Sequence, residues 1–368
     1  MKDRRTLIYL ILISMFLISM LALLASAESS TQSGAKSYVL YNPELNLFLS
    51  EKNMNMRLPM ASTTKILTAL IAIEKLNPDE PITITKESVG IEGSSVYLAE
   101  GDVITVRDLI YSVLLQSAND ASVALALRIG GTIESFAEMM NTRASEIGAT
   151  DTNFENPHGL DSDNHYTTAK DLALIAAAAL SNDTFRKISS TQKYSFNIGD
   201  KTRCLVNHNK LLSQYDGCIG VKTGYTKRCG RCLVSAAYRD GITLVAVTLS
   251  DPNDWQDHKK LLDLGFSSLQ SIDLKKVANI PDSLPVIYGC KDSVKICVRD
   301  SERYYITKND SEAPKIAVNL IPYVTNSVKA GDALGEIIIT EENNTKRIDI
   351  IAQEDVRAKG NKFPLFAK

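Results

Sequence analysis

The sequence predicts an α+β protein in which both ends of a first domain complete one antiparallel sheet around a helical block, followed by a small all-β domain. Strand-like runs flank a turn at residues 42–46, and a second pair flanks a turn at 239–241. Apolar residues at helical spacing fill the sequence between these two pairs. The 368 residues are enough for two domains.

The first domain is expected over residues 37–267. Its hairpins are predicted at 38–41 with 47–49 and at 232–238 with 242–249. Helices are predicted after Ser62 and over 106–115, 121–129 and 172–180. Thr168 and Asp171 resemble a capping box for the last of these helices. Because strands lie at both ends of this helical block, we expect them to share one sheet.

The second domain is expected over residues 270–352. Helical spacing stops after Phe266, and short runs with alternating apolar residues follow, such as Val294, Ile296 and Val298. Polar turns such as 341–344 divide these runs. This pattern is typical of a small domain made of strands.

The N-terminus carries the pattern of a secretory signal peptide, predicted over residues 1–27 and followed by a Ser-rich spacer at 28–36. Basic residues precede an apolar run at 7–24, which ends in small residues before Glu28. This apolar run is longer than in most signal peptides, so an uncleaved membrane anchor is the alternative. Either way, we expect the rest of the chain to be exported.

The C-terminus is a short basic tail at residues 353–368. Gly360 and Pro364 make it a poor helix. Its basic residues lie beside apolar ones, namely Arg357, Lys359, Lys362 and Lys368 beside Phe363, Leu365 and Phe366. This composition makes an anionic membrane surface a candidate partner through weak contact.

Composition argues against several classes of function. The chain has 41 Lys and Arg against 43 Asp and Glu, a net charge of -2, so no basic field is available to bind nucleic acid. The four His residues have no pair at the i, i+4 spacing of helical zinc ligands. We therefore expect no nucleic-acid partner, no catalytic metal and no cofactor.

The six cysteines leave three alternatives open. Cys290 and Cys297 flank a short polar stretch between two strand-like runs, where a disulfide across a hairpin is one reading. Cys229 and Cys232 form a Cys-x-x-Cys pair, which fits a redox or metal pair, although a four-cysteine set would also need Cys204 and Cys218. Free buried thiols are the third alternative.

Ser62-Thr-Thr-Lys65 is the first of three motifs that carry chemistry. A three-residue offset at a helix start places the hydroxyl and the amine on one face. An alcohol is a weak nucleophile and needs a nearby base, which a desolvated neutral lysine can supply. A capping serine with a solvated lysine is the plain structural alternative.

The other two motifs are Ser117-Ala-Asn119, between two predicted helices, and Lys222-Thr-Gly224, at the start of a strand-rich run. The Ser117 hydroxyl can relay a proton, and the Asn119 amide can both donate to and accept from a substrate amide. A cation with a hydroxyl suits a carboxylate, and glycine permits close backbone approach. A helix cap and a surface strand are the plain alternatives.

In combination and in this order, the three motifs resemble those of the penicillin-recognising serine enzymes. The chain most resembles a low-molecular-weight D-alanyl-D-alanine carboxypeptidase. Wider matches lie at residues 117–121, 156–161, 165–169, 207–212, 220–226 and 232–234, together spanning about 36–266. The resemblance implies a serine β-lactamase/transpeptidase-like fold for the first domain, and the all-β domain resembles the one that follows in that family.

The resemblance also implies roles for these residues. Ser62 would attack the carbonyl of the penultimate D-alanine with Lys65 as its base. Ser117 and Lys222 would handle the proton of the leaving amine, and Asn119 would hold the peptide amide. Thr223 beside Gly224 would bind the terminal carboxylate, and the backbone N–H groups of Ser62 and Tyr225 would form the oxyanion hole.

The implied substrates are peptidoglycan stem peptides, with β-lactam antibiotics as inhibitors, and the implied place of action is the cell wall or the outer face of the cytoplasmic membrane. A serine β-lactamase is the main alternative within the class, with Glu155 as its deacylating base, but the neighbouring residues 156–160 favour the carboxypeptidase. A catalytically silent wall-binding module would require a broken site, whereas all three motifs are intact. His158 and His165 are interpreted as structural loop residues.

Overall fold

The computed structural model describes residues 33–299, 302–307, 314–325, 327–341 and 344–359. The chain divides into two compact units, Met1–Arg239 with Thr243–Gly265, and Asp240–Ile242 with Phe266–Lys368. The predicted signal peptide, residues 28–32 of the spacer and residues 360–368 of the tail lie outside the described residues. Within those described, no helix combines the length and apolar character needed to cross a membrane.

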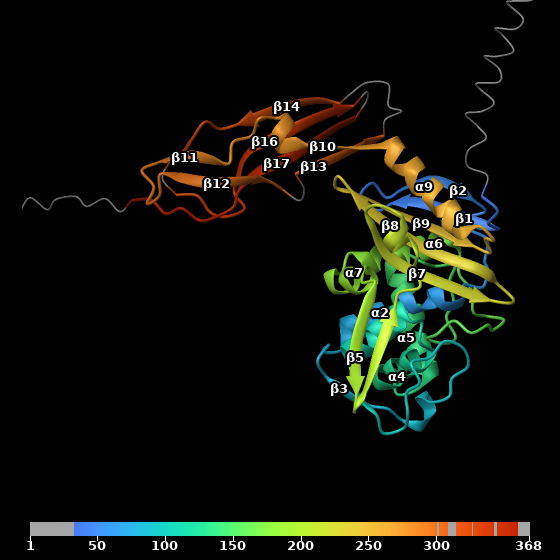
Figure 1. The fold of residues 1–368 in the computed structure, drawn as a ribbon. Helices are drawn as coiled ribbons and strands as arrows, with labels where there is room; N and C mark the ends of the chain where they lie inside the picture. Colours follow the sequence, from blue (N-terminus) through green and yellow to red (C-terminus); the bar gives the residue numbers. More distant parts are fainter. Residues whose placement is uncertain (1–32, 300–301, 308–313, 326, 342–343, 360–368) are drawn as a thin grey trace, which may run out of the picture. The chain divides into compact units, whose positions relative to one another are not determined.

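A five-stranded sheet forms the centre of the first unit, with strand order β2-β1-β9-β8-β7 (Figure 1). The strands are β1 (Ser37–Asn42), β2 (Leu47–Lys52), β7 (Cys218–Thr226), β8 (Gly230–Arg239) and β9 (Ile242–Leu249). β1 pairs antiparallel with both β2 and β9, and Val39 lies opposite Val247. The predicted sheet, completed from both ends of the domain, is therefore confirmed.

Helices pack on both faces of this sheet. Successive side chains of a strand point to opposite faces. In β1, Val39 and Tyr41 join the helical core, whereas Leu40 lies against Gly265 of α9 (Asp254–Ser268). The sheet is consequently sandwiched between α9 and a block of helices.

The helical block follows the predicted order, with further elements between. It comprises α2 (Lys65–Lys75), α3 (Val106–Leu115), α4 (Asn119–Gly130), α5 (Ile133–Ile147), α6 (Ala169–Leu180), α7 (Asp183–Ser189) and the short α8 (Leu211–Gln214). Short 3-10 helices lie at η2 (Ala61–Thr64) and η3 (Lys86–Ser88). Two small strand pairs, β3 (Pro81–Thr83) with β4 (Val103–Thr105) and β5 (Lys193–Ile198) with β6 (Lys201–Val206), complete it.

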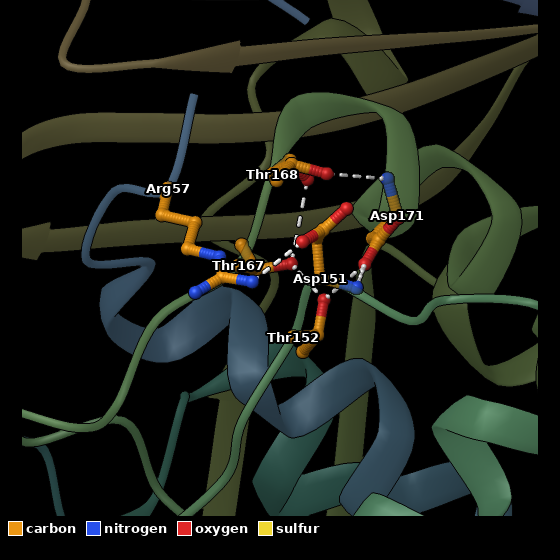
Figure 2. A network of polar contacts seen from close by, with 6 residues as sticks. All are labelled: Arg57, Asp151, Thr152, Thr167, Thr168 and Asp171. Carbon is orange, nitrogen blue, oxygen red and sulfur yellow. Dashed lines mark hydrogen bonds and ion pairs between the residues drawn. The ribbon is translucent and has the colours of Figure 1, made fainter. Parts of the chain in front are cut away.

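A polar network fixes the start of α6 to a neighbouring loop (Figure 2). The Thr168 hydroxyl accepts a hydrogen bond from the Asp171 N–H, which is the expected cap. The Asp171 carboxylate does not complete the predicted capping box. It accepts instead from the N–H of Asp151 at 2.7 Å and from the Thr152 hydroxyl at 2.8 Å. Arg57 pairs with Asp151 at the edge of this network.

The second unit contains a six-stranded sheet of order β14-β16-β17-β12-β11-β15 and the pair β10-β13. Its elements are β10 (Leu269–Asp273), α10 (Leu274–Val277), β11 (Ser283–Ile287), β12 (Ser293–Val298), β13 (Arg303–Thr307), β14 (Lys315–Leu320), β15 (Val324–Thr325), β16 (Ala333–Glu341) and β17 (Asn344–Ala352). Val294, Ile296 and Val298 point into its core, as their alternation predicts. One turn of helix, α10, is the only addition to the predicted strands among the residues described.

We expect Asp171→Ala to lower the free energy of unfolding by about 1–3 kcal/mol, because the partly buried Asp151 N–H and Thr152 hydroxyl lose their acceptor. Chemical denaturation monitored by circular dichroism measures this change. Asp200→Ala, at an exposed turn, is the matched control and should have a much smaller effect. Equal losses in the two variants would contradict the structural role of the network.

Candidate active site

Ser62 lies in the 3-10 turn η2, directly before α2, as the motif predicts. Ala61 adopts a positive φ of 46°, an uncommon backbone conformation for a residue with a side chain. The Thr64 hydroxyl donates to the Ala61 carbonyl at 2.8 Å. On the other side, a Cβ at Gly159 would lie 1.9 Å from the same carbonyl oxygen, so only glycine fits there. The turn that presents Ser62 is therefore held from two directions.

Two loop histidines support this turn. The Nδ1 of His165 accepts from the Glu155 N–H at 3.0 Å, so its Nε2 carries the proton and donates to the Thr64 hydroxyl at 2.8 Å. Burial lowers the pKa of His165 to about 4 and that of His158 to about 3. Both rings are therefore neutral near neutral pH, and neither lines the pocket described below.

Lys65 is fully buried at the start of α2. Its Nζ lies 3.0 Å from the Ser62 Oγ, 2.7 Å from the Asn119 Oδ1 and 2.6 Å from the main-chain oxygen of His158. Burial, aided by the positive charge of Lys222, holds the pKa of Lys65 well below its ordinary value, while Asp120 opposes this shift. The neutral form of this amine is consequently more accessible than that of an exposed lysine.

The Ser117 motif joins α3 to α4, and Ser117 has a positive φ of 60°. The Asn119 N–H donates to the Ser94 carbonyl at 2.7 Å, which anchors the start of α4. The Asn119 side chain accepts from Lys65 through Oδ1 and donates to the Glu92 carbonyl through Nδ2. These contacts fix the orientation of the amide close to Ser62 and Lys65.

The third motif lies on β7. Lys222 is 1% exposed, and its Nζ donates to the Thr223 carbonyl at 2.9 Å. Burial lowers the pKa of Lys222 to about 7. Among the contacts described for these residues, none joins the Lys222 amine to the Ser117 hydroxyl. A Cβ at Gly224 would lie 3.1 Å from the Ser62 nitrogen, so the glycine lets β7 approach Ser62 closely.

One pocket of about 640 Å³ brings the exposed parts of the three motifs together. Ser62, Ser117, Thr223, Gly224 and Tyr225 line it. The other sequence-predicted residues lie buried behind this wall, namely Lys65, Asn119 and Lys222. The structure thus brings all the predicted site residues to one place, some at the surface of the pocket and some beneath it.

The pocket wall also contains residues that the sequence analysis did not select, among them Arg231, Asp254 and Trp255. The Arg231 guanidinium pairs with the Asp254 carboxylate at 2.9 Å and lies 5.7 Å from the centre of the Trp255 ring. Its buried Nε has no hydrogen-bond partner. Arg231 lies opposite Tyr225 in the β7–β8 ladder, and opposite residues share one face of a sheet. The register of the two strands is therefore the signal from which Arg231 could have been predicted.

A serine beside a buried lysine, next to a strand that carries Lys-Thr-Gly on a sheet with a helical block, defines the class of penicillin-recognising serine enzymes. A family model described as D-alanyl-D-alanine carboxypeptidase matches residues 24–253. A second, described as the C-terminal domain of penicillin-binding protein 5, matches residues 271–358. The chain belongs to the D-alanyl-D-alanine carboxypeptidase family, the low-molecular-weight penicillin-binding proteins, so the resemblance and the fold class predicted from the sequence are both confirmed.

Individual proteins agree with this assignment. The chain is 30% identical to D-alanyl-D-alanine carboxypeptidase DacF of Bacillus subtilis, over 89% of this chain and 87% of that protein. It is 30% identical to DacC of Escherichia coli, over 89% and 85%. The solved structure of penicillin-binding protein 5 from Haemophilus influenzae matches with a TM-score of 0.66 and 28% identity, over 89% of this chain and 98% of that one. The Streptomyces K15 DD-transpeptidase matches with a TM-score of 0.62 and 34% identity, over 65% and 99%.

We expect Lys65→Arg to slow acylation of the protein by penicillin by about 10²- to 10⁴-fold, because arginine keeps a positive charge and cannot accept a proton. Labelling with fluorescent penicillin over time measures the rate. Lys75→Arg, at an exposed position of the same helix, is the control. A folded Lys65→Arg protein that acylates at the wild-type rate would exclude Lys65 as the base.

Proposed function

We propose that this protein removes the terminal D-alanine from peptidoglycan stem pentapeptides through an acyl-enzyme on Ser62, and that β-lactams acylate the same hydroxyl. The proposal depends chiefly on one observation, the 3.0 Å contact between the Ser62 hydroxyl and a buried amine of lowered pKa. Such a pair supplies both the nucleophile and the base that acyl transfer requires.

The partners of Lys65 support a role as base. In its neutral form the amine has two N–H groups and one lone pair. The Asn119 Oδ1 and the His158 carbonyl oxygen can only accept hydrogen bonds, so they take the two N–H groups. The lone pair is then left for the hydroxyl of Ser62, which can donate its proton as the oxygen attacks.

The remaining roles follow from the same pocket. The buried Lys222, with its pKa of about 7, can hold or release a proton near neutral pH, and the Ser117 hydroxyl borders the same space. We assign the proton of the leaving amine to these two residues, and the peptide amide of the substrate to Asn119. The closeness of Gly224 to the Ser62 nitrogen supports an oxyanion hole made by the N–H groups of Ser62 and Tyr225.

Terminal-carboxylate recognition is assigned to Thr223 with Lys222, and the fold adds Arg231 to the same pocket. A guanidinium suits a carboxylate because its donors form a planar fork. The Asp254 carboxylate already pairs with part of this guanidinium and holds Arg231 in place. The pocket therefore offers both a hydroxyl and a positive charge to a substrate that ends in a free carboxylate.

The alternatives find less support. The carboxylate of Glu155 accepts a hydrogen bond from the Ser162 hydroxyl and does not line the pocket, which disfavours Glu155 as the deacylating base of a β-lactamase. The intact motifs disfavour a silent wall-binding module. Membership of this family implies action outside the cytoplasm. Export by residues 1–27 and membrane contact by the tail stay predictions, and the described residues do not cover those segments fully.

Intact mass after incubation with penicillin, combined with D-alanine release from a peptide ending in D-alanyl-D-alanine, tests the proposed function. We expect one stable adduct, which Ser62→Ala abolishes together with D-alanine release. Rapid turnover of penicillin without a lasting adduct would favour the β-lactamase. Failure to form any adduct would favour the silent module.

Thr223→Val should reduce the catalytic efficiency toward a peptide with a free terminal carboxylate by about 10- to 100-fold, since a charge-assisted hydrogen bond is lost. The ester or amide analogue of the peptide should be affected much less. Steady-state kinetics on both substrates measures the difference. Equal losses on the two substrates would remove Thr223 from this role.

Arg231→Leu should raise the KM for the free-carboxylate peptide by about 3- to 10-fold and leave its amide analogue nearly unchanged, because the partly exposed guanidinium is worth less than a buried charge. Arg228→Leu is the matched control, since Arg228 pairs with Asp163 and does not line the pocket. If both variants behave alike, Arg231 does not read the carboxylate.

A further inference from the structure

Lys210 lines the pocket but has no part in the acyl-transfer chemistry proposed above. The end of β6 and the segment that follows it supply four residues of the pocket wall, namely Val206, Asn207, His208 and Lys210. Lys210 is exposed, and no carboxylate in the part of the chain that the structure describes pairs with its amine. A positive charge without a partner therefore borders the pocket.

The segment that carries Lys210 is held firmly in place. The Asn207 side chain donates through Nδ2 to the Ser189 carbonyl at 3.1 Å and accepts through Oδ1 from the Asn209 N–H at 2.9 Å. Asn209 is 3% exposed, and its Oδ1 accepts from the Leu211 N–H at 3.1 Å. These bonds fix the backbone on both sides of Lys210, so the lysine borders the pocket from a defined position.

The charges around the pocket leave a positive surplus. Asp254 is the only acidic residue among those described for the pocket wall, and the Arg231 guanidinium already pairs with it at 2.9 Å. Lys222, buried behind the wall, has a pKa of about 7 and so adds part of a positive charge near neutral pH. Lys210 adds a further positive charge. The pocket is therefore suited to a ligand that carries more than one negative charge.

The proposed substrate is such a ligand, and this step rests on the proposed function. Its terminal carboxylate is assigned to Thr223 with Lys222 and Arg231. In an extended peptide the third residue of the stem lies roughly 7 Å from the terminal D-alanine. The pocket of about 640 Å³ lies within the range of roughly 300–1,000 Å³ that holds a drug-sized ligand, so it has room for this residue as well.

We propose that Lys210 binds a second carboxylate of the substrate, on the acyl side of the scissile bond. A stem peptide has two sources of this group, the side chain of the third residue when that residue is a diamino dicarboxylic acid, and the γ-linked glutamate that precedes it. The third residue is nearer to the scissile bond, so Lys210 is assigned to its side-chain carboxylate. The site then favours stem peptides with a diamino dicarboxylic acid over those with lysine.

Two peptides that differ in one group test this assignment. Both end in D-alanyl-D-alanine, preceded in one by diaminopimelate and in the other by lysine, which lacks only the side-chain carboxylate. We expect the KM of the wild type to be about two- to fivefold lower for the diaminopimelate peptide, as for an exposed charge pair, and the difference to shrink at high salt. Lys210→Gln should abolish the preference, and Lys210→Arg should keep it.

Lys201→Gln is the matched control, because Lys201 is exposed on β6 and does not line the pocket. It should keep the wild-type preference. A Lys210→Gln protein that also keeps the full preference would overturn the assignment to the third residue.

A second pair of peptides distinguishes the two sources of the carboxylate. Both have lysine as the third residue, preceded by a γ-linked glutamate whose α-carboxylate is free in one and amidated in the other. If Lys210→Gln alters the preference only in this pair, Lys210 binds the glutamate and the assignment to the third residue is wrong. If it alters the preference in neither pair, the proposed carboxylate site is overturned.

Calorimetry with the Ser62→Ala protein separates this result from the proposed function. Binding of the same peptides to this variant reports the carboxylate preference without catalysis. A wild type that releases no D-alanine from any of the peptides would contradict the proposed function. Equal affinities of the Ser62→Ala protein for both members of each pair would instead contradict the role of Lys210.

Discussion

Lys65 brings an amine into the interior of the first unit, where burial lowers its pKa and so favours the neutral form that a base requires. Transfer of an isolated ammonium to an apolar interior is so unfavourable that the group loses its proton instead. Three oxygens surround the nitrogen, and they come from separate parts of the chain, namely Ser62, Asn119 and His158. The nucleophile, the start of α4 and the loop before α6 must therefore all be correctly placed before the lysine can act as a base.

The loop that carries His158 is itself held in place by contacts with several other parts of the fold. Its next residue, Gly159, packs against the Ala61 carbonyl of the nucleophile turn so closely that a side chain has no room. Further along, His165 holds Thr64, and the same loop is joined at its ends to Asp171 of α6. The network of Figure 2 thus lies outside the pocket, yet it fixes the segment that supplies one of the three oxygens around Lys65.

Sequence reasoning was most successful where residue type and spacing carry the information. The three-residue offset of Ser62 and Lys65 places both groups at a helix start, and strand runs at both ends predicted the shared sheet. The His158 oxygen could not be predicted in this way, because a main-chain carbonyl in a loop has no signature in residue type. Arg231 was missed although its position opposite Tyr225 in the strand ladder specifies it. The Asp171 carboxylate accepts a hydrogen bond from the Asp151 N–H and does not complete the capping box, because tertiary contacts competed with the local cap.

The burial of the two lysines also affects the stability of the fold. A lysine whose pKa is lowered by folding binds fewer protons in the folded than in the unfolded state, so the stability of the protein rises with pH between the two values. For Lys222 this pH range runs from about 7 to the ordinary pKa of 10.5. At pH values below this range the burial of Lys222 lowers the free energy of unfolding by its full amount, on the order of a few kcal/mol. Lys65 adds an effect of the same sign.

Ile66, Leu67, Leu70 and Ile71 are almost completely buried on the helix that begins at Lys65, and each such side chain contributes about 1.5–3 kcal/mol. Apolar burial along α2 therefore offsets part of the destabilisation that the burial of two lysines imposes, and Lys65 and part of the core are placed by the same helix.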